Sequence, residues 1–507
     1  MRNSSKVAFA VASAIAGTLA AGQASATDYN IYITGASAQR AFWTGKYLQK
    51  LCGGGAGVSQ FDTSGNRISD GVAITTFAAK TNNNGPVSGN ADLKAFRCTG
   101  TGASDATIAL NDTLTMHYSA EMGSVWGIMP GLFAAGHGGS QTREFLEPGT
   151  GTGCSSAASN ASTGSTLYGF SRNCPGTAEG SYYNGEDLVY PDTSGFFARH
   201  TPDIIVTDIE PTKWAFADNW PTNTPAGLTW HTGVHTSIFG PTPSQSDLQD
   251  VKDSGGAVIG QVFAVVLSTQ GNSFTMPGNL SMTSAKTIFQ GQARYWDDLP
   301  ELHGVSGAHT QINLCRRDHG SGTQTSASIT FTGKECGLIF NHAFASTADK
   351  GRLLSVQENT TGGALGTCVA STPNSIGIMN VAASSNWTVP TIDGIQPNAH
   401  NAASGAWPYA YETWGARIAG DGDQGIADAM MVDILSRDSL QDALGGEVGS
   451  FDSAGHFVVT GTANIKGYYA LQSGNDVSVA NIQDSGILPV QGFDRAGESC
   501  NVPTFDF

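Results

Sequence analysis

The chain has 507 residues, of which 25 are Lys or Arg and 42 are Asp or Glu, so its formal net charge is −17. At roughly 100–200 residues per domain, this length allows two or three domains with sizeable cores. Hydrophobic residues make up 40% and charged residues only 13%, which excludes a disordered acidic chain. No basic run follows the first few residues, and phosphate-backbone binding needs clustered Lys and Arg. We therefore do not expect the protein to bind nucleic acid.

The N-terminus predicts export. Arg2 and Lys6 precede an apolar stretch from Val7 to Ala21, and Ala24-Ser25-Ala26 follows as a small-x-small cleavage site. The apolar stretch is shorter than the roughly 20 residues that a membrane span needs. We interpret residues 1–26 as a cleaved signal peptide. No Cys follows the cleavage site, so we expect a periplasmic or secreted protein without a lipid anchor, not inserted in the membrane.

The cysteines agree with an oxidising compartment. All eight lie after residue 26, and no two are within ten residues of each other, which argues against a metal site. We expect disulfides, up to four of them, and no metal or other cofactor. Only the pairs that are local in the sequence, Cys52–Cys98 and Cys154–Cys174, can be guessed among the many possible pairings.

The predicted elements alternate between strands and helices. The chain opens with a strand at 29–33, a turn of small residues at 34–38 and an amphipathic helix at 39–51. The stretch 52–200 is rich in Gly, Ser, Thr and Asn, which is typical of long surface excursions held by disulfides. Further along we predict strands at 202–206 and 258–267 and helices at 283–295 and 425–443. This order predicts an α/β fold.

The segment from Ile312 to Ser326 carries the strongest chemical signal. A strand ends in Arg316 and Arg317, and Gly320-Ser321-Gly322-Thr323 opens a predicted helix. Free N–H groups at a helix start favour an anion, and an Arg guanidinium can bind an oxyanion with two parallel hydrogen bonds. The alternative is an ordinary capped helix beside two surface arginines.

Several blocks of the sequence resemble, in order, the phosphate-binding protein family of ABC uptake systems. The blocks are Val258–Leu267, Lys286–Gly291, Tyr295–Asp298, Arg316–Thr323, Asn374–Ile378, and Ile392–Asn401 with Ser404–Pro408. The similarity is good over 256–450, recognisable at 29–43 and 203–215, and absent over most of 52–200.

The resemblance implies a two-lobed periplasmic-binding-protein fold of type II, each lobe a mixed sheet flanked by helices. The first lobe would combine 27–257, with an insertion at about 52–200, and 408–507, while the second lobe would be 258–407. The ligand would be an inorganic oxyanion, phosphate above all, held between the lobes. The closed protein would then dock on an ABC permease.

The resemblance also assigns ligand-binding residues. Arg317 would clamp the anion, while Ser321, Gly322 and Thr323 would supply hydroxyl and backbone donors. Asp208 falls where the family has an Asp that accepts a hydrogen bond from a protonated ligand. From its position after a strand alone, Asp208 could equally be a helix cap.

Two loops depart from the family pattern. The first loop is Ser37-Ala38-Gln39-Arg40, in which Gln39 and Arg40 replace the usual Thr-Phe pair and still suit an anion. The second loop aligns Ser119 and Glu121 with ligand positions, and Glu121 would stand where a Ser donor is expected. A slip of a few residues would bring Ser119 or Ser124 to that position instead.

Enzymatic functions are less supported. The chain contains no GxSxG, HExxH or GxxxxGK[ST] motif, and His319 is too near Ser321 along one turn to act as its base. We therefore expect a binding protein and not an enzyme. The alternative is a secreted or surface-displayed structural or adhesion protein that reuses this fold with an altered ligand site, a role that the Gly-, Ser- and Thr-rich stretch at 52–200 would suit.

Overall fold

The structure is a computed structural model that describes most of the chain after the predicted signal peptide. The described residues are 26–40, 42–53, 75–79, 93–101, 107–120, 123–138, 141–149, 155–159, 170–174, 197–216, 220, 242–317, 320–333, 336, 344–346, 355–359, 362–381, 387–435, 449–459, 467–469, 493–494, 500 and 504–505. Residues 1–25, Glu121 and Cys154 lie outside them, so the signal peptide stays a prediction. Within these ranges, no helix has the length and apolar character needed to cross a membrane.

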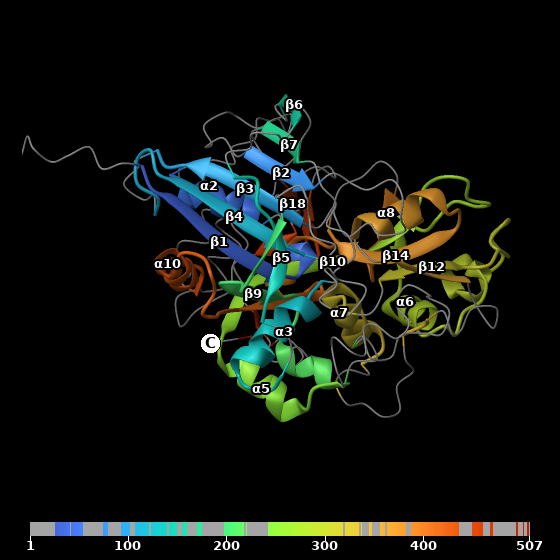
Figure 1. Ribbon diagram of the computed structural model, residues 1–507. Coiled ribbons are helices and arrows are strands. Elements are labelled where there is room, and N and C mark those ends of the chain that lie inside the picture. Colours follow the sequence, from blue (N-terminus) through green and yellow to red (C-terminus); the bar gives the residue numbers. More distant parts are fainter. Residues whose placement is uncertain are drawn as a thin grey trace, which may run out of the picture.

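One long strand, β10 (Gly256–Ser268), joins two groups of strands into a mixed sheet. Its first part pairs antiparallel with β17 (Ala410–Arg417), and its second part pairs antiparallel with β14 (Ser375–Asn380). From Val258 onward β10 is buried, as expected for an apolar strand covered on both faces. Figure 1 shows β10 between two bodies, which we call the first lobe (around β1 and β4) and the second lobe (around β12 and β14).

The first lobe is built on the strand order β17-β9-β1-β4-β3-β2-β7-β6. At its centre, β1 (Asp28–Gly35) runs parallel to both β9 (Ile204–Thr207) and β4 (Thr113–Ser119). The other strands of the lobe are β2 (Thr75–Ala79), β3 (Leu93–Thr99), β6 (Ser155–Ser159) and β7 (Phe170–Cys174), with the separate pair β5 (Arg143–Leu146) and β8 (Phe197–His200).

Helices cover both faces of this sheet. Because successive strand residues point to opposite faces, Ile204 and Val206 belong to one apolar cluster and Ile205 to the other. The first cluster contains residues of η2 (Phe42–Tyr47), α2 (Leu48–Leu51) and α10 (Gln424–Leu435). The second contains residues of α3 (Val125–Ala134), η4 (Pro211–Phe216) and α5 (Gln245–Asp253), and it continues into the second lobe.

The second lobe places β12 (Asn313–Arg317) parallel to both β13 (Ser355–Asn359) and β14. Its helices are α6 (Met282–Phe289), α7 (Gly322–Phe331), α8 (Gly362–Ser371) and α9 (Ala399–Ala403). Short elements complete the described chain: η1 (Ser37–Gln39), η6 (Trp296–Asp298), η7 (Pro300–Leu302), β11 (Asn279–Leu280), β15 (Trp387–Thr388), β16 (Thr391–Ile392), β18 (Gly449–Phe451), β19 (Phe457–Val459), β20 (Tyr468–Tyr469), β21 (Phe493–Asp494) and β22 (Thr504–Phe505).

The α/β class expected from the sequence is confirmed, and most predicted elements are found near their expected bounds. The predicted helix at 283–295 ends at Phe289, because Gly291 takes a left-handed φ of 69°. The predicted helix at 39–51 is divided into η1, η2 and α2. The lobe boundaries at residues 257 and 407 stay a prediction.

The interpretation of 52–200 as surface excursions is wrong for its best-described part. This part contains β3, β4 and α3, and Phe96, Met116 and Ile128 are all buried in apolar clusters. Gly, Ser and Thr dominate the composition of the whole stretch, but its short apolar runs belong to the core, as in β4, which is buried over most of its length.

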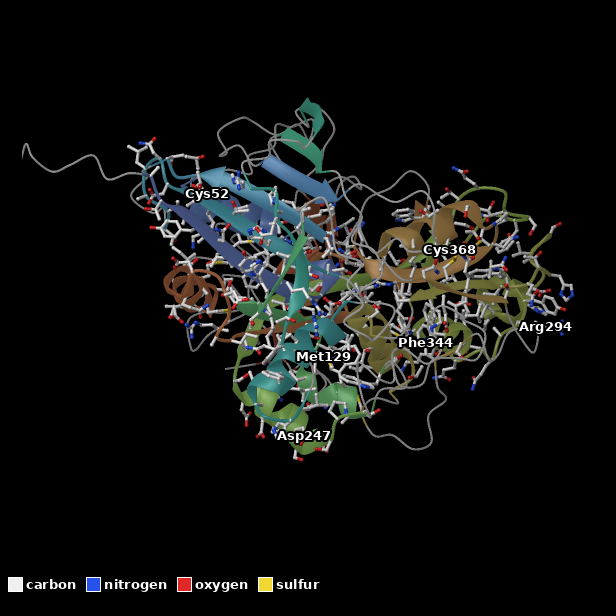
Figure 2. The ribbon with its side chains drawn as sticks, viewed as in Figure 1. Cys52, Met129, Asp247, Arg294, Phe344 and Cys368 are labelled. Atoms are coloured by element: carbon white, nitrogen blue, oxygen red, sulfur yellow. A yellow bond between two sulfur atoms is a disulfide. The ribbon has the colours of Figure 1, made fainter. Side chains whose placement is uncertain are left out.

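Three disulfides lie within the described residues. Cys52–Cys98 is the predicted local pair, while Cys315–Cys368 and Cys336–Cys500 were not foreseen. Figure 2 shows Cys52 in the first lobe and Cys368 in the second. The predicted pair Cys154–Cys174 involves a residue outside the described ones. Disulfides of this number indicate an oxidising, extracytoplasmic compartment.

We expect a non-reduced digest, analysed by mass spectrometry, to contain a cross-linked peptide pair for each of these three disulfides. Replacing both Cys315 and Cys368 with Ser should lower the free energy of unfolding by about 2–4 kcal/mol, because the bond restricts the unfolded chain. Denaturant unfolding measures this loss. Recovery of Cys315 and Cys368 as free thiols in the exported protein would contradict the expectation.

Candidate functional site

Asp208 lies at the centre of the contacts between the two lobes. It follows β9, is only 2% exposed, and its N–H donates to the Ser124 hydroxyl at 3.1 Å. Across the lobes, the Thr323 hydroxyl donates to Asp208 Oδ2 at 3.3 Å. The other carboxyl oxygen, Oδ1, is buried and has no hydrogen-bond partner among the described residues. One carboxyl oxygen of Asp208 therefore has a hydrogen-bond donor and the other has none, which differs from a simple helix cap.

The surroundings of Asp208 bring the pKa of its carboxyl close to neutral pH. Burial raises the pKa of its carboxyl to about 6, although the positive charge of Arg317 and hydrogen bonds from Thr323 and Ser124 act in the opposite direction. At neutral pH the group is mainly an ionised acceptor, and it becomes a donor when it takes up a proton.

The N-terminus of α7 faces Asp208, since Thr323 in its first turn donates to that carboxyl, and Ser321 caps the helix. The Ser321 hydroxyl accepts the Gln324 N–H at 3.3 Å, and Gln324 Oε1 in turn accepts the Arg317 N–H at 3.1 Å. The Gln324 Nε2 group is buried and unpartnered within the part of the chain that the structure describes. The helix start, with its partial positive charge, thus lies beside an unpaired amide donor and an unpaired carboxyl oxygen.

Gly322 is the closest contact between the lobes at this point. A Cβ atom on Gly322 would lie 2.2 Å from Ser124 Oγ and 2.8 Å from Asp208 Cβ. A few residues away, the Val125 N–H at the start of α3 donates to the Gly320 carbonyl at 3.1 Å. The lobes therefore meet here without room for any side chain at position 322.

If this is the oxyanion site that the sequence resemblance implies, Gly322→Ala should weaken binding at least about tenfold, since the added methyl group must displace Ser124 and Asp208 or hold the lobes apart. Isothermal titration calorimetry with phosphate measures the change. Gly278→Ala is the matched control, because a Cβ atom there meets nothing within 4 Å. Equal affinities for the two variants would mean that Gly322 does not set the closed geometry.

Arg317 ends β12 and is 3% exposed. Its Nε donates to the Asn359 carbonyl at 3.2 Å, while a Cβ atom on Gly123 would lie 4.0 Å from one terminal nitrogen and one on Gly362 would lie 3.8 Å from the other. The guanidinium therefore lies between a turn of the first lobe and the start of α8. Its charge acts on the Asp208 carboxyl, as the pKa of that group shows.

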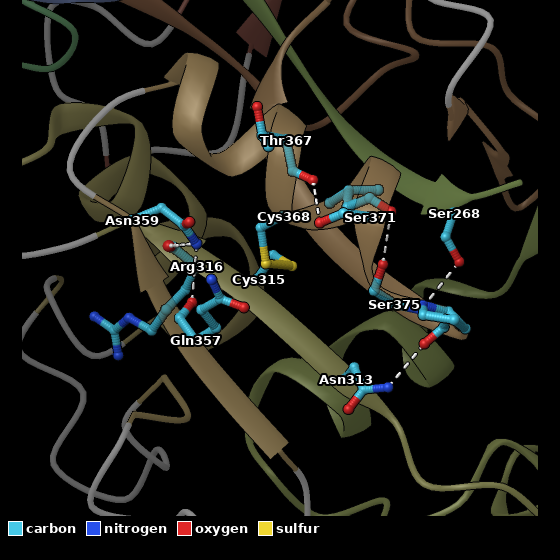
Figure 3. Close-up of a disulfide and its surroundings, with 12 residues drawn as sticks. Ser268, Asn313, Cys315, Arg316, Gln357, Asn359, Thr367, Cys368, Ser371 and Ser375 are labelled. Carbon is cyan, nitrogen blue, oxygen red and sulfur yellow. Dashed lines mark hydrogen bonds between the residues drawn. A yellow bond between two sulfur atoms is a disulfide. The ribbon is translucent and has the colours of Figure 1, made fainter. Parts of the chain in front are cut away.

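A rigid support holds this arginine. Figure 3 shows the Asn359 amide donating to the carbonyls of Arg316 and Gln357, at 3.1 and 3.0 Å. The same figure shows the Cys315–Cys368 disulfide, which links β12 to α8. Cross-links on both sides of the end of β12 fix the direction in which Arg317 leaves the strand.

Arg316 is placed differently from Arg317. Its Nη1 donates to the Ala345 carbonyl at 2.8 Å, and its guanidinium lies over the Phe344 ring, 5.5 Å from the centroid. Glu358 lies 3.9 Å from its Nε. Arg316 is thus engaged within the second lobe, and of the two arginines Arg317 is the one associated with Asp208.

Within the first loop, Ser37–Arg40, the Gln39 side chain and the Ala38 carbonyl are hydrogen-bonded to other parts of the chain. Gln39 Nε2 donates to the Thr207 carbonyl at 2.8 Å, and Gln39 Oε1 accepts from the Trp43 indole at 3.2 Å. The Ala38 carbonyl accepts from the Tyr468 hydroxyl. Gln39 therefore fixes the loop against β9, which places the loop next to Asp208.

Of the two serines proposed for the second loop, Ser124 is the one that contacts Asp208. Ser119 ends β4, where its carbonyl accepts the Thr34 hydroxyl at 3.1 Å. Glu121, predicted at a donor position, lies outside the described residues.

Sequence reasoning missed several polar groups of the site. Gln324 could have been found, since Ser321-x-x-Gln324 is a capping pattern. Gln261 of β10 lies opposite Tyr468 of β20, and both its side-chain polar atoms are buried and unpartnered among the residues described, but it was hidden in an apolar run. Tyr468 and Asn380 reach the site from β20 and β14, and nothing near them in the sequence signals this.

No model of a known protein family matches the chain, and no curated protein matches it either. Solved structures that resemble it include an ABC-type phosphate transport receptor from Vibrio cholerae (16% identity, TM-score 0.28, 38% of this chain and 72% of that one). Others are PstS from Borrelia burgdorferi (14%, 0.26, 39% and 72%) and a phosphate-binding protein from Stenotrophomonas maltophilia (15%, 0.27, 43% and 74%).

These descriptions agree with the family that the sequence blocks resemble.

Proposed function

We propose that the protein is an exported solute-binding protein that captures an inorganic oxyanion, phosphate in the first place, between its two lobes. The observation that carries the proposal is a group of buried polar atoms without partners in the described chain, Asp208 Oδ1 and Gln324 Nε2, beside the Arg317 guanidinium and the start of α7. Each unpaired buried polar atom costs about 1–3 kcal/mol. An oxyanion that bonds to both would remove this cost.

The mixture of charges favours an anion that still carries a proton. Arg317 and the N-terminus of α7 attract negative charge, while an ionised Asp208 repels it unless a ligand O–H donates to the carboxylate. Phosphate keeps at least one proton at neutral pH, so it can satisfy both requirements together. Sulfate and other fully ionised anions can satisfy only the first.

Capture requires the lobes to move, because Asp208, Arg317 and Thr323 are all at most 3% exposed. We propose that the lobes part about β10, the strand that the two lobes share, and close again over the anion. In the closed form the bound anion would replace part of the direct contact between Asp208 and Thr323. Delivery to an ABC permease would follow from the closed form.

Isothermal titration calorimetry of the exported protein with phosphate tests the proposal. We expect a dissociation constant in the micromolar range or tighter, with arsenate bound similarly because it has the same shape and protonation. An absence of binding heat for phosphate, arsenate and sulfate would contradict uptake. That result would favour the alternative of a displayed structural protein with a lost ligand site.

A further inference from the structure

A short strand near the C-terminus brings a tyrosine to the edge of the site. β20 pairs antiparallel with β10, where Tyr468 lies opposite Gln261 and Tyr469 opposite Gly260. Gly260 makes this possible, since a Cβ atom there would lie 2.1 Å from the Tyr469 ring. Tyr469 is buried in the cluster that includes the second lobe, while Tyr468 packs against the cluster of the first.

The hydroxyl of Tyr468 contacts both lobes. It donates to the carbonyl of Ala38, in the first loop of the first lobe, and Asn380, at the end of β14 in the second lobe, is close enough to lower its pKa. The Tyr468 ring also lies 6.0 Å from that of Phe42, which follows the same first loop. One side chain thus connects the first loop to the second lobe.

Tyr468 is also close enough to the site for nearby charges to change the pKa of its hydroxyl. Burial raises the pKa of its hydroxyl above the usual range, the negative charge of Asp208 raises it further, and the positive charge of Arg40 lowers it. At neutral pH the hydroxyl is therefore protonated and available as the donor to Ala38.

The segment that carries Tyr468 is covalently tied to the second lobe as well. Cys500, downstream of β20, forms a disulfide with Cys336, which follows α7. The Val262 N–H of β10 donates to the Gly467 carbonyl at 2.9 Å, and this hydrogen bond fixes the start of β20. The C-terminal part of the chain is held at β10 and at Cys336, on both sides of Tyr468.

We propose that Tyr468 is a positioning residue of the anion site, a latch that fastens the Ala38 loop to the second lobe and so determines how long the closed form retains its ligand. The proposal rests on the proposed function for its ligand. The latch itself is a contact between the lobes and is present without a ligand. With the latch closed, the first loop is held against Asp208 and the second lobe. Loss of the hydroxyl frees the loop, and the lobes open more often.

The test compares Tyr468→Phe with the unmodified protein, using Tyr295→Phe as the matched control. Tyr295 lies beside Arg294, which Figure 2 labels at the far end of the second lobe. Stopped-flow measurement of phosphate release should show a rise of about five- to tenfold in the dissociation rate for Tyr468→Phe, the change expected from losing one or two hydrogen bonds. Tyr295→Phe should leave the rate unchanged.

Hydrogen exchange of the ligand-free protein provides a readout that does not depend on the ligand. Exchange should accelerate in Tyr468→Phe at residues 36–43 and at the Val125 amide, which bonds across the lobes to Gly320. Unchanged exchange at these amides, or faster exchange with an unchanged phosphate release rate, would overturn the proposal. Faster exchange in a protein that binds no phosphate at all would support the latch and contradict the proposed function.

Discussion

Replacing Arg317 with Ala is expected to weaken phosphate binding by about 30-fold or more, since removing one partner of a buried charge pair typically costs about 2–5 kcal/mol. The guanidinium is buried, and its Nε is fixed by the Asn359 carbonyl, which leaves the terminal nitrogens directed between Gly123 and Gly362. Without it, the anion would meet the Asp208 carboxylate without the guanidinium that opposes its negative charge. Calorimetry measures the loss.

Two further variants make the Arg317 experiment specific. Arg317→Lys keeps the charge but loses the planar pair of donors, so we expect an affinity between those of the unmodified protein and Arg317→Ala. Arg294→Ala, at an exposed position far from the site (Figure 2), should bind phosphate normally. An affinity for Arg317→Ala within about threefold of the unmodified protein would show that this arginine does not contact the ligand.

Arg317→Ala should also change the protonation of Asp208. The charge of Arg317 lowers the pKa of the Asp208 carboxyl against the larger effect of burial. Removing it should therefore raise that pKa above its value of about 6 in the unmodified protein. A carboxyl with a higher pKa is protonated over more of the neutral range, and this can be followed by NMR titration.

Local sequence patterns were sufficient to predict on which elements the residues of the candidate site lie, where these residues stand at strand ends and helix starts. Asp208 directly follows an apolar strand, and Ser321 directly precedes a helix, so their positions on adjoining elements follow from strand and helix periodicity. The choice of Arg317 over Arg316 came from the family resemblance. In the structure, alternation along β12 separates the two side chains, and Asn359 and Ala345 bind them in different places.

Contacts between distant segments could not be predicted. Spacing left Ser119 and Ser124 open, and the packing of Ser124 against Gly322 joins two segments that are far apart in the sequence. Tyr468 meets Ala38 across 430 positions of sequence through a two-residue strand that has no periodicity of its own. The Cys315–Cys368 pair likewise depends on the adjacency of β12 and α8, which the sequence alone did not reveal.

Phosphate is expected to bind far better than sulfate at neutral pH, and Asp208 is the residue that should discriminate between them. Its Oδ1 is buried without a partner among the described residues, and Thr323 already donates to Oδ2. A phosphate O–H can donate to the free oxygen, whereas sulfate has no proton to donate. An unpaired contact between buried negative charges costs several kcal/mol, so the expected preference is roughly a thousandfold. Competition calorimetry with the two anions measures it.

Asp208→Asn should reduce this preference, because an amide can donate to sulfate and no longer carries a charge. In the unmodified protein, lowering the pH should also reduce the preference for phosphate over sulfate. As the pH falls through about 6, Asp208 takes up a proton and becomes a donor, so sulfate affinity should rise in the acidic range, and it should not rise in this way in Asp208→Asn. Equal affinities for the two anions at neutral pH would show that Asp208 is a structural acid.

The raised pKa of the Asp208 carboxyl also predicts how the stability of the folded protein depends on pH, and this prediction needs no ligand. The folded-state pKa of Asp208, about 6, lies above the ordinary value of 3.8, so the folded state binds the proton more tightly than the unfolded state does. The resulting stabilisation is fully present below the ordinary pKa and is lost as the pH rises through about 6. Asp208→Asn lacks this titration, so the free energy of unfolding of the unmodified protein, relative to that of the variant, should fall across this interval. A difference that does not change with pH would mean that Asp208 ionises in the folded protein as it does in water, which would remove the basis for selecting a protonated anion.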